Sequence, residues 1–171
     1  MSSFRKDVLM TGQILRVPIL GVDIEVITDR FINTTMGNEE FLPINGAFEA
    51  LRKLHEKFNG KIVIVSSASI SSRKHIYAWL GEQHFHKATG ISLENVEFCL
   101  QVSGITRMCQ ETQITHFISS RLRDLYSLQQ AQVPSLYLLG GNEEEMRPYN
   151  ETSFSVIRTG SWKEVLEKIL S

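Results

Sequence analysis

Polar side chains interrupt or follow three apolar runs of the sequence. Asp23 places a carboxylate inside the apolar run 19–27, and Ser66 follows the apolar run 61–65. A third run ends in two hydroxyls and a guanidinium, at 119–121. A charge inside an apolar strand is costly unless it is compensated, and ligands of open parallel sheets bind outside the carboxyl ends of the strands. We therefore expect these side chains to meet in one polar ligand-binding site.

The segments that must position these groups alternate between short β-branched runs and amphipathic helical patterns. This alternation indicates strand–helix–strand units, and thus an α/β fold with a parallel sheet covered by helices on both faces. The expected strands are 19–27, 61–65, 96–100, 114–118, 135–139 and 154–157, and the clearest expected helices are 46–58 and 162–170. The first strand is predicted to be central, flanked by the strands that end at Ser66 and at Ile118.

Length and composition exclude several classes of protein. The 171 residues fit a single domain, 1–171, and a formal net charge of −1 gives no electrostatic support for nucleic-acid binding. The longest apolar runs are strand-length, far below the roughly 20 residues of a membrane helix. The N-terminus has no apolar segment typical of a signal peptide, so we expect a cytoplasmic protein. Cys99 and Cys109 are expected to be buried thiols rather than a disulfide.

A strand that carries an acid, a strand that ends in Ser, and a later strand that ends in a polar pair resemble, in that order, the haloacid dehalogenase-like phosphohydrolases. The resemblance covers about 18–170 and is most specific at 46–51, 64–67 and 114–118, which look like small bacterial members of the family. It implies a three-layer αβα fold and an Mg²⁺-dependent phosphatase active site.

The resemblance assigns catalytic positions to three residues. Asp23 matches the family's aspartate nucleophile, which is also a metal ligand, and Glu25 matches the second acid two residues later. Ser66 matches the hydroxyl that hydrogen-bonds the phosphoryl group, with Ser67 beside it.

Several other family positions hold neutral residues in this chain. The family's lysine falls on Ile105, and the nearest base is Arg107. Ser119 and Ser120 stand where the family places the aspartates that bind Mg²⁺. Hydroxyls are poorer ligands for this hard cation, so we expect metal binding at Asp23 to be weak or absent.

Other charged side chains are candidates to restore part of the missing charge. Arg107, Arg121 and Arg123 are the cations that would have to turn into the site. Asp29 is either a displaced acid of the first motif or an ordinary loop aspartate. Asp124 lies one helical turn after Ser120 and, on a regular helix, is expected to point away from the site.

Three functions stay open, and the first is favoured. The chain is a catalytically degenerate phosphatase that binds an unknown protein or ligand, a weak Mg²⁺-dependent phosphatase that uses Asp23, or a module that binds a phosphorylated ligand without turnover. No cofactor is expected, unless the phosphatase interpretation holds and requires Mg²⁺. The segment 28–45 is too short for a cap domain, so we expect a capless member with a flap there, and homo-oligomerisation is left open.

Overall fold

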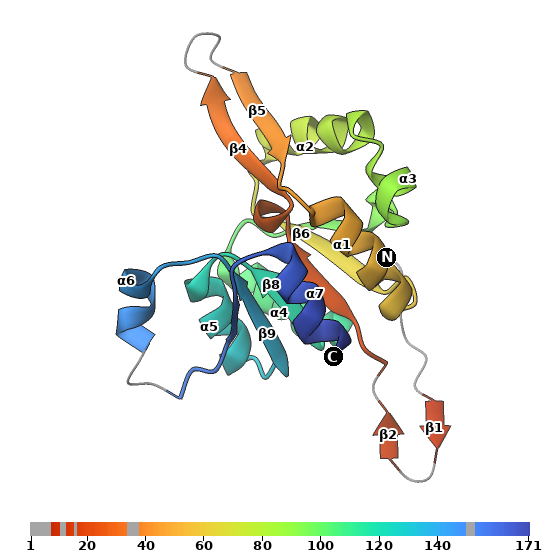
Figure 1. The fold of residues 1–171 in the computed structure, drawn as a ribbon, viewed down its shortest axis with the longest axis vertical. Helices are drawn as coiled ribbons and strands as arrows, with labels where there is room; N and C mark the ends of the chain where they lie inside the picture. Colours follow the sequence, from red (N-terminus) through yellow and green to blue (C-terminus); the bar gives the residue numbers. More distant parts are fainter. Residues whose placement is uncertain (1–7, 11–12, 16, 34–37, 150–152) are drawn as a thin grey trace.

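A six-stranded parallel sheet forms the centre of the computed structural model, which describes residues 8–10, 13–15, 17–33, 38–149 and 153–171 (Figure 1). The strand order is β10-β9-β8-β3-β6-β7, and every neighbouring pair is parallel. The strands are β3 (Leu20–Asp23), β6 (Ile62–Ser66), β7 (Val96–Phe98), β8 (His116–Ser119), β9 (Ser135–Leu139) and β10 (Ile157–Thr159). As predicted, β3 is central and lies between β6 and β8.

Helices cover both faces of the sheet because successive strand residues point to opposite sides. On one face, Ile62 and Ile64 of β6 share a core with α1 (Ala47–Lys57), α2 (Ile70–Glu82), α3 (Phe85–Thr89) and α7 (Trp162–Leu170). On the other face, Val63 and Val65 share a core with α4 (Val102–Thr112) and α5 (Leu122–Gln130). This arrangement confirms the predicted three-layer αβα fold.

Apart from the two strands of the segment expected as a flap, which are described below, the remaining elements are short. They are the antiparallel strands β1 (Val8–Met10) and β2 (Gln13–Leu15), the helix α6 (Glu143–Met146), and the 3-10 helices η1 (Ile24–Val26), η2 (Leu93–Asn95) and η3 (Arg147–Tyr149). Within the residues described, no helix combines the length and the apolar character needed to cross a bilayer.

The predicted strand 19–27 is wrong at its end. The strand β3 stops at Asp23, and the chain turns at once into η1. The side chain of Asp23 causes this turn, because it accepts a hydrogen bond from the backbone N–H of Glu25. Ile24 and Val26 are buried in the turn as they would be in a strand, so their apolar character does not reveal the change. The last strand was also misplaced, because β10 begins at Ile157, where the predicted strand ends.

The segment expected as a flap contains an antiparallel hairpin of β4 (Thr28–Asn33) and β5 (Asn38–Pro43). Figure 1 shows the hairpin extending away from the central sheet, beside α2. Phe41 of β5 packs against Trp79 of α2, with ring centroids 6.0 Å apart. Its role as a flap over a ligand site stays a prediction.

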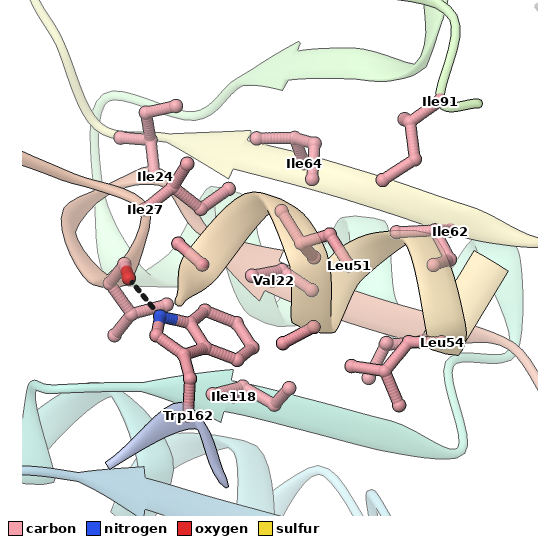
Figure 2. Close-up of a cluster of buried hydrophobic side chains, with 14 of the residues drawn as sticks. Val22, Ile24, Ile27, Leu51, Leu54, Ile62, Ile64, Ile91, Ile118 and Trp162 are labelled. Atoms are coloured by element: carbon pink, nitrogen blue, oxygen red, sulfur yellow. Dashed lines mark hydrogen bonds between the residues drawn. The ribbon is translucent and has the colours of Figure 1, made fainter. Parts of the chain in front are cut away.

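Trp162 connects the last helix to the turn that follows Asp23 (Figure 2). Its indole is 2% exposed and lies in the core beneath α1, and its Nε1 donates a hydrogen bond of 2.8 Å to the carbonyl oxygen of Val26. The hydrogen bond gives the carbonyl of the buried Val26, the last residue of η1, a donor from another part of the chain. Trp162 therefore holds η1 in place.

We predict that Trp162→Phe lowers the free energy of unfolding by about 1–3 kcal/mol, because it leaves the buried Val26 carbonyl unpaired. Trp79→Phe is the matched control, since the indole nitrogen of Trp79 is buried and has no hydrogen-bond partner among the described residues. Urea denaturation of both variants measures the difference. Equal losses of stability would contradict the assigned role of the Trp162 hydrogen bond.

His116 at the start of β8 gives the fold a pH dependence. Its Nδ1 lies 2.8 Å from the Thr115 hydroxyl, and its ring packs against Phe58 and Tyr137. Burial lowers the pKa of His116, and the nearby Lys57 lowers it further. In the pH range between the lowered pKa and the ordinary value of about 6.5, the unfolded chain binds a proton that the folded protein does not.

We therefore expect the free energy of unfolding to fall as the pH drops through this range, from about 6.5 downward. His116→Gln should reduce this part of the pH dependence, because glutamine does not titrate. Chemical denaturation of both proteins at a series of pH values measures the two slopes. Slopes that do not differ would show that His116 is not responsible.

Candidate functional site

The carboxylate of Asp23 is buried at the carboxyl end of β3, where it is 3% exposed. One of its oxygens, Oδ1, accepts a hydrogen bond of 3.0 Å from the Glu25 amide. The other, Oδ2, accepts a hydrogen bond of 3.0 Å from the hydroxyl of Ser119 at the end of β8. The expectation that Asp23 and Ser119 meet at one edge of the sheet is confirmed.

Ser119 fixes the chain that leaves β8. Its side chain is completely buried, and its Oγ accepts a hydrogen bond of 3.0 Å from the backbone N–H of Arg121 while donating to Asp23. Arg121 has an extended backbone, and the helix α5 begins only at Leu122. The arginine is thereby held beside the end of β3.

The guanidinium of Arg121 lies among three carboxylates. Its Nε is 3.0 Å from Oε2 of Glu25, 3.4 Å from Oδ2 of Asp124 and 3.5 Å from Oδ2 of Asp23. Its Nη2 donates a hydrogen bond of 2.7 Å to the hydroxyl of Ser67. One predicted candidate cation, Arg121, thus contacts both predicted acids and one predicted serine.

The expectation that Asp124 points away from the site is wrong. Asp124 is 3% exposed and pairs with Arg121, because α5 begins at Leu122 and Asp124 lies in its first turn. Burial raises the pKa of Asp124, Arg121 opposes this effect, and Asp23 adds to it. An acid in the first turn of a helix that follows a strand end was the signal in the sequence that would have placed Asp124 here.

The serines that follow β6 have different surroundings. Ser66 is 1% exposed, and its Oγ accepts a hydrogen bond from the backbone N–H of Ala68. Ser67 is half-buried and accepts from Arg121. Both serines line a hollow of about 290 Å³ together with Glu25, so the structure brings these three predicted residues together.

A larger cleft of about 990 Å³ is lined in part by Arg121. Its walls come mainly from the starts of α4 and α5, and it is lined by Ser67, Leu100–Ser103, Ile105, Ser120–Asp124, Glu145, Pro148 and Tyr149. Asp23 is not among the residues that line either hollow. The candidate nucleophile is thus covered by the groups that bind it.

The other predicted residues are less central. Ile105 is 3% exposed in the core beneath α4 and borders the cleft, as do Ser120 and the exposed Arg123. Arg107 is exposed on α4 and is not among the cleft-lining residues. Asp29 is exposed on β4, where it pairs with Leu42 of β5, so it is neither a loop residue nor a lining residue of the two hollows.

The arrangement does not fit the Mg²⁺ ion that the resemblance implies. Mg²⁺ requires oxygen ligands at about 2.0–2.1 Å in octahedral geometry. Both oxygens of Asp23 instead accept hydrogen bonds, Ser119 supplies a donor, and the nitrogen of Arg121 is the atom on which the carboxylates converge. Among the residues that the structure describes, no three His, Cys, Asp or Glu side chains are arranged to hold a metal ion.

We predict that Ser119→Ala lowers the free energy of unfolding by about 1–3 kcal/mol, because the buried Asp23 carboxylate loses a donor. Ser120→Ala removes a neighbouring, half-buried hydroxyl and is the matched control, for which a much smaller loss is expected. Thermal and urea unfolding distinguish the two serines. A loss for Ser119→Ala no larger than for the control would show that its hydroxyl does not support Asp23.

Comparisons with known proteins identify the fold. No family model matches the chain, and the comparison with curated proteins finds no match. Among solved structures, D,D-heptose 1,7-bisphosphate phosphatase from B. bronchiseptica, complexed with magnesium and phosphate, is 15% identical, with a TM-score of 0.59 over 90% of this chain and 98% of that chain. The same enzyme from Burkholderia thailandensis is 12% identical, with a TM-score of 0.61 over 90% and 99%.

A second kind of phosphatase is similar to the same extent. The 3-deoxy-D-manno-octulosonate 8-phosphate phosphatase from Moraxella catarrhalis, in complex with magnesium, phosphate and KDO, is 17% identical, with a TM-score of 0.55 over 90% of this chain and 86% of that chain. At these identities the likeness establishes the fold. The central parallel sheet, the order of its strand ends and these structural neighbours together show that the chain has a haloacid dehalogenase-like fold.

Proposed function

We propose that this protein is a catalytically degenerate phosphatase, which uses a phosphatase-type fold to bind a partner or ligand rather than to hydrolyse a phosphate ester. The observation that supports this proposal most directly is the set of contacts that the two carboxylate oxygens of Asp23 make. Its Oδ2 accepts from Ser119 and lies 3.5 Å from Arg121, while its Oδ1 accepts from Glu25. The residue in the nucleophile's position is engaged on both oxygens.

Phosphoryl transfer requires a nucleophile that reaches phosphorus and cations that neutralise the phosphoryl oxygens. Two of the similar phosphatases were solved with magnesium and phosphate. In this chain the corresponding strand ends offer the hydroxyl of Ser119 instead of a carboxylate, and Ile105 stands at the position expected for the lysine. Loss of one electrostatic partner in an active site typically costs about 10²–10³ in rate, so two such losses leave little turnover.

The charges of the site also oppose a phosphorylated ligand next to Asp23. Asp23, Glu25 and Asp124 share the single guanidinium of Arg121. A site built to receive phosphate is net positive apart from its nucleophile, whereas this group of side chains carries more acids than bases. This excess of acids supports a binding function that does not require a phosphate group next to Asp23.

One observation favours a second candidate, a module that binds an anion in the larger cleft. Both α4 and α5 begin at this cleft, and neither has a side chain that caps its N-terminus. Backbone N–H groups at helix starts attract anions. Thermal stabilisation by inorganic phosphate that is lost in Arg123→Gln would favour this candidate over partner binding.

We expect the purified protein, with Mg²⁺ present, to hydrolyse p-nitrophenyl phosphate no faster than its Asp23→Asn variant. The reason is that Asp23 is enclosed by its own hydrogen-bond donors and lacks acidic neighbours on β8. Steady-state assays of both proteins across a range of Mg²⁺ concentrations provide the measurement. Robust Mg²⁺-dependent turnover that Asp23→Asn abolishes would overturn the proposal and establish the weak phosphatase instead.

A further inference from the structure

We infer that Arg121 is a resident cation that takes the place of a divalent metal ion among Asp23, Glu25 and Asp124, so that removing its charge creates a divalent-cation site. This inference rests on the proposed function, because it concerns the same site, and it identifies the group that supplies positive charge there. It also explains why the carboxylates lie together although the residues around them do not fit Mg²⁺.

The first observation is the convergence of three oxygens on a single atom. Oxygens of Glu25, Asp124 and Asp23 lie 3.0, 3.4 and 3.5 Å from the same Arg121 Nε. One N–H group donates one strong hydrogen bond, so it does not serve three acceptors by hydrogen bonding. The three carboxylates therefore lie around one positive centre, the guanidinium of Arg121.

The second observation is an unsatisfied buried oxygen that faces this centre. Oδ2 of Asp124 has no hydrogen-bond partner in the described structure, and its side chain is 5% exposed. The Nε of Arg121 likewise makes no well-formed hydrogen bond. A buried carboxylate oxygen normally accepts hydrogen bonds or pairs with a cation, and Asp124 Oδ2 pairs with Arg121, whose Nε is 3.4 Å away.

The hydroxyls of the site hold the guanidinium in place. The backbone N–H of Arg121 donates to Ser119, and its Nη2 donates to Ser67, so the side chain is held between the ends of β8 and β6. A carboxylate at position 119 would add a fourth negative charge, whereas a hydroxyl donates to Asp23. The neutral residues at these strand ends are therefore the ones that suit a singly charged organic cation.

Without the guanidinium, the carboxylates of Asp23, Glu25 and Asp124 would lose the cation that they share, while the side chains of Asp23 and Asp124 are each only 5% exposed. An added divalent cation can replace this positive charge if the carboxylate oxygens move toward the position that the guanidinium occupied. Ca²⁺ tolerates irregular geometry and distances of about 2.3–2.6 Å, so it is a better probe than Mg²⁺ alone. The three acids come from β3, η1 and the first turn of α5, and their backbones are fixed by those elements.

The experiment measures thermal unfolding with and without Ca²⁺ or Mg²⁺, for the natural protein, Arg121→Ala and Arg121→Gln. We expect no cation effect on the natural protein. The two variants should unfold at a lower temperature without cation, and Tm should rise by about 3–6 °C when the cation is at about ten times its Kd. Arg107→Ala, which removes an exposed arginine of α4 that does not line the cleft, is the matched control and should behave like the natural protein.

A second variant shows which groups bind the cation. The double variant Arg121→Gln with Asp23→Asn should lose the cation-dependent rise in Tm, because one of the three ligands is removed. If Arg121→Ala does not fold, Arg121→Gln carries the test, since its amide keeps a donor for Ser67. Isothermal titration with CaCl₂ gives the affinity directly.

Two results would overturn the inference. One is a folded Arg121→Gln that neither Ca²⁺ nor Mg²⁺ stabilises, and the other is a natural protein that these ions stabilise as strongly as the variants. Neither result depends on enzymatic activity. Phosphatase activity of the natural protein would overturn the proposed function. The rise in Tm of the Arg121 variants on addition of a divalent cation would still decide the present inference.

Discussion

A carboxylate buried at the end of the central strand requires compensation, and the surrounding elements are arranged around this requirement. The turn of η1 brings the Glu25 amide to Asp23, β8 brings the Ser119 hydroxyl, and the extended chain after β8 brings Arg121. Ser119 and Arg121 lie far from Asp23 in the sequence, so Asp23 is fully satisfied only when the parallel sheet is assembled with β8 next to β3. The local conformation of the strand ends follows from this one charge.

A guanidinium and a metal ion solve this problem differently. Arginine remains charged at all ordinary pH values and is covalently attached, so its concentration at the site does not vary. A metal ion exchanges with solvent and has coordination positions that a substrate or water can enter. With Arg121 hydrogen-bonded to Ser67 and paired with Glu25, the positive charge of the site is supplied by the chain itself and offers no such exchangeable position.

Strand-end reasoning placed Asp23, Ser66 and Ser119 at one edge of the sheet because parallel strands bring their carboxyl ends together whatever their exact bounds. It failed for Asp124, since the direction of that side chain depends on α5 beginning at Leu122 rather than at Ser120. The role of Arg121 also could not be predicted from the positions of the strand ends. A long side chain reaches many positions, so which of the candidate arginines enters the site depends on what the fold places near each of them.

The hydrogen bond between Trp162 and Val26 has a consequence for the order of folding. It joins residues that are 136 positions apart, and it supports the turn that begins at Asp23. Contacts of such large sequence separation form late, because the entropy of closing a long loop must be overcome before they contribute. The carboxylate turn is synthesised before α7, so it acquires its final support only after α7 has also been synthesised and docked.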